Sequence, residues 1–238
     1  MKNSNSSKIV TTALLAGALF LTATAASAAV DTVKKPHTRT RSGTYETSKG
    51  NSGSFSETTT RAKGQKTTDA TWTNQDGKVG THEATRSYDK TTGTGTTSSS
   101  TTLPNGKTES REGTLTKTGE ASIEAKGTIT GPKGKTSAYD IVSTKTDDGR
   151  SATGTITGPN GKVATVASTT EKVGTGEIER TTTITGPGGK TEQKAIDTKV
   201  NADGSGTRTV EITKRDGTTE TRTLTFQANP TVNPTPTN

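Results

Sequence analysis

One short turn recurs along this chain at nearly constant spacing. The segment TITGPNGK at 155–162 has close copies at 128–135 and 183–190. Glycines in equivalent turn settings return about every 28 residues, and a fixed period of this size is typical of repeat architectures. Such a chain folds as tandem copies of one small unit, because each copy must bury its apolar face against its neighbours. The predicted turn glycines are Gly50, Gly77, Gly106, Gly134, Gly161, Gly189 and Gly217.

The chemistry of this turn predicts β-hairpins. In GPNGK, Pro159 suits the first central position of a type I turn and Asn160 suits the second. Gly161 can take the left-handed conformation that returns the chain to the next strand as a bulge. A second series of glycines lies midway between the first, so each unit holds two turns: Gly64, Gly93, Gly119, Gly149, Gly176 and Gly204.

The segments between these turns alternate as β-strands do. In GEIERTTTIT, alternation places Ile178, Arg180, Thr182 and Ile184 on one face and glutamates and threonines on the other. The predicted fold is all-β, an antiparallel meander of roughly 14 strands at most, each of roughly 8–12 residues, with no helix after residue 28. The pattern leaves open whether the sheet is a single layer or folds over on itself. Large residues recur five positions before the turn glycines and form a predicted core column: Tyr45, Trp72, Ile129, Ile156, Ile184 and Ile212, interrupted only by Thr101.

Large apolar residues are scarce. Leu, Ile, Val and Phe make up about 11% of the residues after Ala28, below the level at which disorder becomes the default expectation. The chain has no cysteine, so no disulfide compensates for the small core. We therefore expect the apolar stripe of the sheet to be covered, by closure of the sheet, by copies of the chain or by another surface.

The two ends of the chain differ from the repeats. Residues 1–28 have the cationic start, the apolar middle and the small-residue end of a bacterial signal peptide, which predicts export to the periplasm, the cell surface or the medium. The apolar stretch is short for a membrane span, so no transmembrane segment is expected in the mature chain. We expect a basic, flexible arm at 29–42, the repeat domain at 43–228 and an extended proline-rich tail at 229–238.

No residue pattern indicates catalysis or a cofactor. His82 lies on a mostly polar segment without the neighbours that nucleophilic or general-base chemistry requires. Asp147, Asp148 and Asp203 lie in turns and match no calcium-loop spacing. We expect a protein that is not an enzyme and that holds neither a metal nor a cofactor.

The formal charge of +8 favours an acidic partner but fits plain solubility equally well. Anionic polysaccharide and lipid headgroups are the candidates, whereas aromatic residues, at 3% of the chain, are too few for specific nucleic-acid binding. An outer-membrane barrel is disfavoured because the predicted strands have too few apolar residues for a lipid-facing side. The expected polyanion contacts lie in the basic arm: Lys34, Lys35, Arg39 and Arg41.

Three hypotheses for function remain. The leading one is an exported structural or interaction protein for adhesion, extracellular matrix or fibres, which self-associates through the open edges of its first and last strands. The alternative is a periplasmic or secreted binding module for an acidic glycan or lipid. The third is a largely disordered secreted polypeptide.

Overall fold

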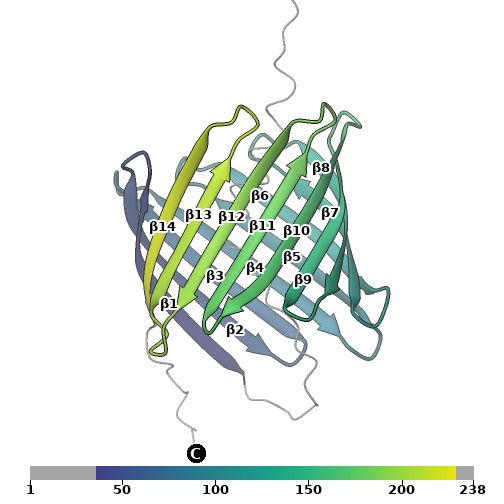
Figure 1. The fold of residues 1–238 in the computed structure, drawn as a ribbon, viewed down its shortest axis with the longest axis horizontal. Coiled ribbons are helices and arrows are strands. Elements are labelled where there is room, and N and C mark those ends of the chain that lie inside the picture. Colours follow the sequence, from purple (N-terminus) through teal and green to yellow (C-terminus); the bar gives the residue numbers. More distant parts are fainter. Residues whose placement is uncertain (1–35, 229–238) are drawn as a thin grey trace, which may run out of the picture.

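The computed structural model describes residues 36–228, and the regular structure there is all β-strand. Fourteen antiparallel strands follow one another in chain order, and β1 also pairs with β14, so that the sheet closes into a barrel (Figure 1). The predicted all-β meander is confirmed. Of the arrangements that the sequence left open, the sheet folds over on itself by closing into a barrel. The strands are β1 (His37–Thr47), β2 (Ser52–Ala62), β3 (Gln65–Asn74), β4 (Val79–Asp89), β5 (Thr94–Thr102), β6 (Thr108–Lys117), β7 (Ser122–Thr130), β8 (Thr136–Lys145), β9 (Gly149–Thr157), β10 (Val163–Gly174), β11 (Glu177–Thr185), β12 (Thr191–Val200), β13 (Gly206–Thr213) and β14 (Thr219–Ala228).

The recurring turn has the geometry that its residues predict. The Gly161 N–H donates to the Gly158 carbonyl at 2.9 Å, and the Gly158 N–H donates to the Lys162 carbonyl at 2.8 Å. Gly161 has a φ of 73°, which a β-branched residue would reach only with strain. All the glycines of the first series have positive φ, whereas Gly119 and Gly149 of the second series do not.

The two ends of the barrel are distinct. The first-series turns lie at one end, which we call the turn rim; β1 begins and β14 ends at the other, which we call the terminal rim (Figure 1). A path that passes from each residue to its ladder partner, strand by strand round the barrel, returns to β1 about 16 residues away from the residue where it began. This offset corresponds to a strand tilt of about 40° and a backbone radius of roughly 13 Å. An eight-stranded barrel is narrow enough for ordinary side chains to fill, so this wider interior needs long ones.

The seam between β1 and β14 is a regular ladder from Arg41 opposite Ala228 to Thr47 opposite Arg222. Beyond it, the Ser48 N–H donates to the Thr221 carbonyl at 2.8 Å. The expectation of open edges on the first and last strands is therefore wrong, because closure pairs those edges with each other.

The expected boundary of the basic arm at residue 42 is also wrong. β1 begins at His37 and pairs with β2 from His37 to Glu46. Thr38 and Thr40 meet Thr60 and Thr58 through hydroxyl contacts of 3.1 Å, so β-branched residues that suit a sheet alternate with the basic ones here. The predicted signal peptide, the arm up to Lys35 and the tail at 229–238 lie outside the described residues.

Most of the scarce large apolar side chains share one face of the sheet. Ile156 lies directly opposite Tyr139 on one side and Ala164 on the other. Ile156 is 1% exposed, and the register brings the whole predicted core column onto this face. The largest buried cluster spans β8 to β11: Tyr139, Ile156, Ala164, Val166 and Ile184.

Several aromatic rings lie over glycines of a neighbouring strand. A Cβ on Gly80 would collide with the indole of Trp72, and one on Gly206 would lie 2.9 Å from Cζ of Phe226. A Cβ on Gly53 would lie 2.6 Å from Oη of Tyr45. A glycine under a ring lets the ring lie flat on the sheet and cover the exposed backbone.

Replacing Gly80 by alanine is expected to lower the free energy of unfolding by about 1–3 kcal/mol, because the new methyl group overpacks the site under Trp72. Gly188→Ala is the control, since a Cβ there has nothing within 4 Å and the residue lacks a positive φ. The control should change stability by less than about 0.5 kcal/mol. Urea denaturation followed by tryptophan fluorescence measures both, and equal midpoints would contradict the packing of Trp72 on Gly80.

Candidate anion-binding interior

Residues that lie directly opposite each other in a ladder share a face, so one assignment runs round the whole barrel. The buried partners Ile156, Tyr139 and Ala164 mark the inward face, and Val163, which is 46% exposed, marks the outward one. Alternate residues of every strand can then be assigned to one face or the other.

Long side chains reach across the interior. Arg86 is on β4 and Arg150 is on β9, which are not neighbours in the sheet. Burial lowers the pKa of Arg86, and the charge of Arg150 lowers it further, so the two cations repel each other across the interior. Burial also lowers the pKa of Arg180 on β11, and the charge of Arg111 on β6 lowers it further. These pairs place cations from opposite walls within electrostatic reach.

The basic residues of the strands are concentrated on the inward face. The exceptions are Lys126 and Lys199, which point outward and pair with Glu124 and Glu177 at 2.9 and 2.8 Å. Their inward counterparts come from strands all round the barrel: Arg39, Arg41, Arg61, Lys66, Arg86, Arg111, Lys117, Lys145, Arg150, Lys172, Arg180, Lys194, Arg208 and Arg222.

The acidic residues of the strands have the opposite distribution. Those that face inward are Glu57, Glu109, Glu192 and Glu220. The others face outward among threonines and serines: Glu46, Asp69, Glu83, Asp89, Glu112, Glu124, Asp140, Glu171, Glu177, Glu179, Asp197 and Glu211. The barrel therefore has a basic inner surface and an acidic outer surface.

Exposure of the inward cations depends on their height in the barrel. Near the terminal rim, Arg61, Lys117, Lys145 and Lys172 are exposed. Lys194, nearer the turn rim, is 8% exposed. A charged group that enters at the terminal rim would therefore meet exposed cations first and buried ones later.

One group of inward cations spans β11 to β14. The pKa of Lys194 falls to about 7, first because of burial and then because neighbouring guanidinium charges oppose its protonation. Another member, Arg208, donates from Nε to Oγ1 of Thr198 at 3.2 Å. We call this group the Lys194 cluster: Arg180, Lys194, Arg208 and Arg222.

Aromatic rings position some of the inward arginines. Cζ of Arg111 lies 4.1 Å from the ring centre of Tyr139, and Cζ of Arg41 lies 4.8 Å from that of Phe226. The Arg222 guanidinium lies 5.3 Å from the ring centre of Tyr45. A cation over an aromatic face is attracted to it and loses little of its hydrogen-bonding capacity.

The inward carboxylates occupy fixed places among these cations. Glu57 lies directly opposite Arg41. Glu192 is 4% exposed, and burial raises its pKa to about 7, although Arg215 and Lys214 act against this rise. A hydrogen bond from Lys49 lowers the pKa of Glu220.

The residues predicted to contact a polyanion fall into two groups. Lys34 and Lys35 lie outside the described residues, whereas Arg39 and Arg41 are on the inward face of β1. Burial lowers the pKa of Arg41 to about 10, and the charges of Arg39 and of Arg208 in the Lys194 cluster contribute to this fall. The sequence-based prediction did not identify the other inward cations.

His82 is a buried polar residue of the wall. It is 3% exposed, its Nδ1 lies 2.8 Å from Oγ1 of Thr101, and burial lowers its pKa. Among residues 36–228, no group of His, Asp and Glu side chains converges as metal ligands do.

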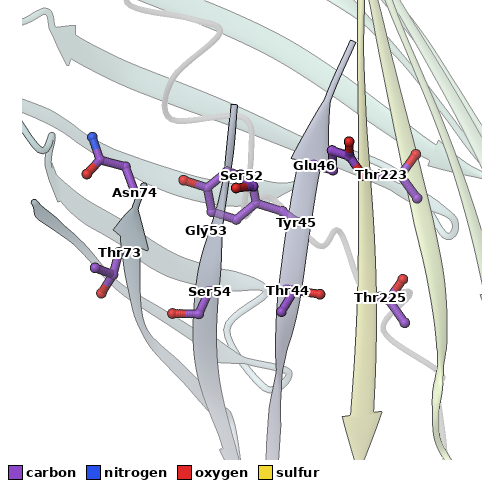
Figure 2. A pocket seen from close by; sticks show the side chains of 10 residues that line it. All are labelled: Thr44, Tyr45, Glu46, Ser52, Gly53, Ser54, Thr73, Asn74, Thr223 and Thr225. Carbon is purple, nitrogen blue, oxygen red and sulfur yellow. The ribbon is translucent and has the colours of Figure 1, made fainter. Parts of the chain in front are cut away.

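The outer wall has a shallow hollow of about 520 Å³ across β14, β1, β2 and β3 (Figure 2). Its lining consists largely of short hydroxyl side chains, including Thr44, Ser54, Thr73 and Thr225, with Glu46 at its edge. This hollow lacks the basic residues of the interior.

Within the described residues, no helix is long and apolar enough to cross a membrane. The chain matches no family model, no curated protein and no solved structure in the comparisons made. Its function must therefore be argued from the geometry of the barrel.

Proposed function

We propose that this protein is a non-enzymatic binding protein whose barrel interior holds an acidic glycan. The observation that carries the proposal is the separation of charge between the two faces of one continuous sheet. Basic residues at inward positions concentrate positive potential in a confined space, and a confined surface of one sign raises the local concentration of ions of the opposite sign.

The energetics of the inward cations support an anionic ligand. Burial and mutual repulsion already lower the pKa of several of them, including Arg86 and Lys194. An anion placed among them would remove repulsion and add charge-assisted hydrogen bonds, which are stronger than neutral ones. The same positions filled by neutral residues would not carry this cost, so the charges indicate a role beyond stability.

Hydroxyl groups and aromatic rings on the same face favour a glycan within the class of anions. Thr97, Ser99 and Thr182 are inward and can exchange hydrogen bonds with sugar hydroxyls. Trp72 adds a flat apolar face that suits the apolar side of a sugar ring. The predicted export signal agrees with a glycan outside the cytoplasm.

The hypothesis of a self-assembling fibre receives less support from the barrel. It depended on unpaired strand edges, and β1 pairs with β14. The outward positions carry threonine, serine and acidic residues, without the apolar band of a lipid-facing barrel. These features favour a single barrel with water on its outside.

Binding of heparin, as a probe polyanion, to the chain beginning at Ala29 tests the proposal. Neutralising the facing pair Arg86→Gln and Arg150→Gln should weaken heparin binding by about tenfold and reduce its salt dependence, since both cations lie inside. The matched control removes the same charge from the outer wall, through Lys126→Gln and Lys199→Gln, and should change affinity by less than about twofold.

Isothermal titration calorimetry at low and high salt measures the heparin affinity of both double variants, and circular dichroism checks that they fold. Uncharged dextran should not bind. If the inner and outer double variants lost heparin affinity equally, heparin would be attracted by net charge alone, and the proposal would be overturned. Binding to anionic vesicles with no binding to heparin would also overturn it, in favour of a lipid ligand.

A further inference from the structure

We infer that the Lys194 cluster is a subsite for a tetrahedral oxyanion, a sulfate or phosphate group carried by the acidic ligand. This inference rests on the proposed function and specifies which acidic group the interior recognises. The subsite lies on the part of the wall formed by β11 to β14, nearer the turn rim than the exposed cations of the terminal rim.

The register brings these cations together from separate strands. Lys194 lies directly opposite Thr182 and Ile212, so Arg180 is its diagonal neighbour on β11. Arg222 lies opposite Val210, the diagonal neighbour of Lys194 on β13. Side chains on one face at diagonal positions are within reach of each other when they are long.

Donors that approach from several strands suit a tetrahedral group better than a planar one. A carboxylate presents two oxygens in one plane and is satisfied by a single guanidinium fork. A sulfate or phosphate group directs its oxygens in several directions, so separate donors can each reach one. Arg208 is also fixed by its 3.2 Å hydrogen bond to Thr198, and Arg222 lies over the ring of Tyr45. These arginines are held in place before a ligand arrives.

The surrounding charges give the subsite a pH dependence. Lys194 is within reach of the charges of Arg180 on β11, Arg208 on β13 and Arg222 on β14. Glu192 lies two residues earlier on the same strand, and Glu220 on β14 lies on the far side of Ile212 from Lys194. The pKa of Lys194 is about 7, so this amine gains its proton as the pH falls below 7. The pKa of Glu192 is also about 7, so its negative charge is lost over the same range. Both changes make the site more positive at low pH, and the arginines stay charged throughout.

Inorganic sulfate is the probe, because its charge is constant between pH 6 and pH 8.5. The chain beginning at Ala29 should bind sulfate at pH 6 and bind it about tenfold more weakly at pH 8.5. Phosphate should also bind at pH 6, whereas acetate at the same concentration should not. Lys194→Gln should weaken sulfate binding at pH 6 by about tenfold. Lys194→Arg should retain binding and lose the part of the pH dependence that Lys194 supplies, because arginine stays charged at both pH values, whereas the part that Glu192 supplies should remain.

The pair Arg86→Gln and Arg150→Gln is the internal control, since these cations lie elsewhere in the barrel. It should change sulfate affinity by less than about threefold while still weakening heparin binding. Absence of saturable sulfate binding, or equal binding of acetate, would overturn the subsite. If heparin still depended on Arg86 and Arg150 in that case, the proposed function would stand without the subsite. If fully desulfated heparin bound as tightly as heparin, the assignment of the ligand's sulfate group to this cluster would be wrong.

Discussion

Ile156→Asp is expected to unfold the barrel or to destabilise it by more than about 4 kcal/mol. Ile156 is 1% exposed and packs between Tyr139 and Ala164, so the substitution removes buried apolar surface and leaves a cavity. It also places a carboxylate where water cannot solvate it. Because large apolar residues are few, the loss of one at the centre of the main cluster is a large fraction of the total stability.

Val163→Asp, in the same hairpin, is the matched control. Val163 points outward and is 46% exposed, so the same new charge meets water there. Its effect should stay within about 0.5 kcal/mol. Circular dichroism and chemical denaturation of both variants measure the difference. If Ile156→Asp melted like the parent chain, the assignment of this face to the interior would fail.

Gly43→Val is expected to open the seam between β1 and β14. A side chain at Gly43 would collide with the Thr225 carbonyl oxygen and lie 2.9 Å from Cα of Phe226, and backbone atoms cannot rotate away. The strain should cost about 3 kcal/mol or more and should expose the edges of both strands. Unpaired edges are templates for pairing with other chains, so the variant should form large species as its concentration rises.

Thr44→Val, at the next residue of the same seam, keeps the β-branched shape and faces outward opposite Thr225. It should leave the barrel monodisperse and its stability within about 0.5 kcal/mol of the parent. Size-exclusion chromatography with light scattering distinguishes the two variants. A monodisperse Gly43→Val with unchanged melting would contradict close contact at the seam.

The fold was largely predictable because its signals are local. Each turn is specified by its own proline, asparagine and glycine, and the register follows from alternation around residues such as Ile156 and Ile184. Barrel closure is different. It depends on small offsets added over all the ladders, so no single turn or strand encodes the pairing of Arg41 with Ala228.

The basic interior left a partial signal in the sequence. Alternation already placed Arg180 on the same face as Ile178 and Ile184, which is unusual for a face that will be buried. The segment HTRTRSG has the same period, with Arg39 and Arg41 between threonines, but it lacks large apolar residues, so its sequence predicts a flexible arm instead of a strand. What the sequence could not supply was the curvature that brings Arg86 near Arg150 and Arg111 near Arg180, because those pairs come from distant strands.

An even number of antiparallel strands gives the barrel an orientation. The entry of β1 and the exit of β14 share one mouth, the one with the exposed Arg61, Lys117 and Lys172. A label or surface tether joined directly before His37 or directly after Ala228 will therefore lie at the mouth where a ligand would first meet exposed cations, whereas one inserted at the Pro159–Gly161 turn will lie at the opposite end of the barrel.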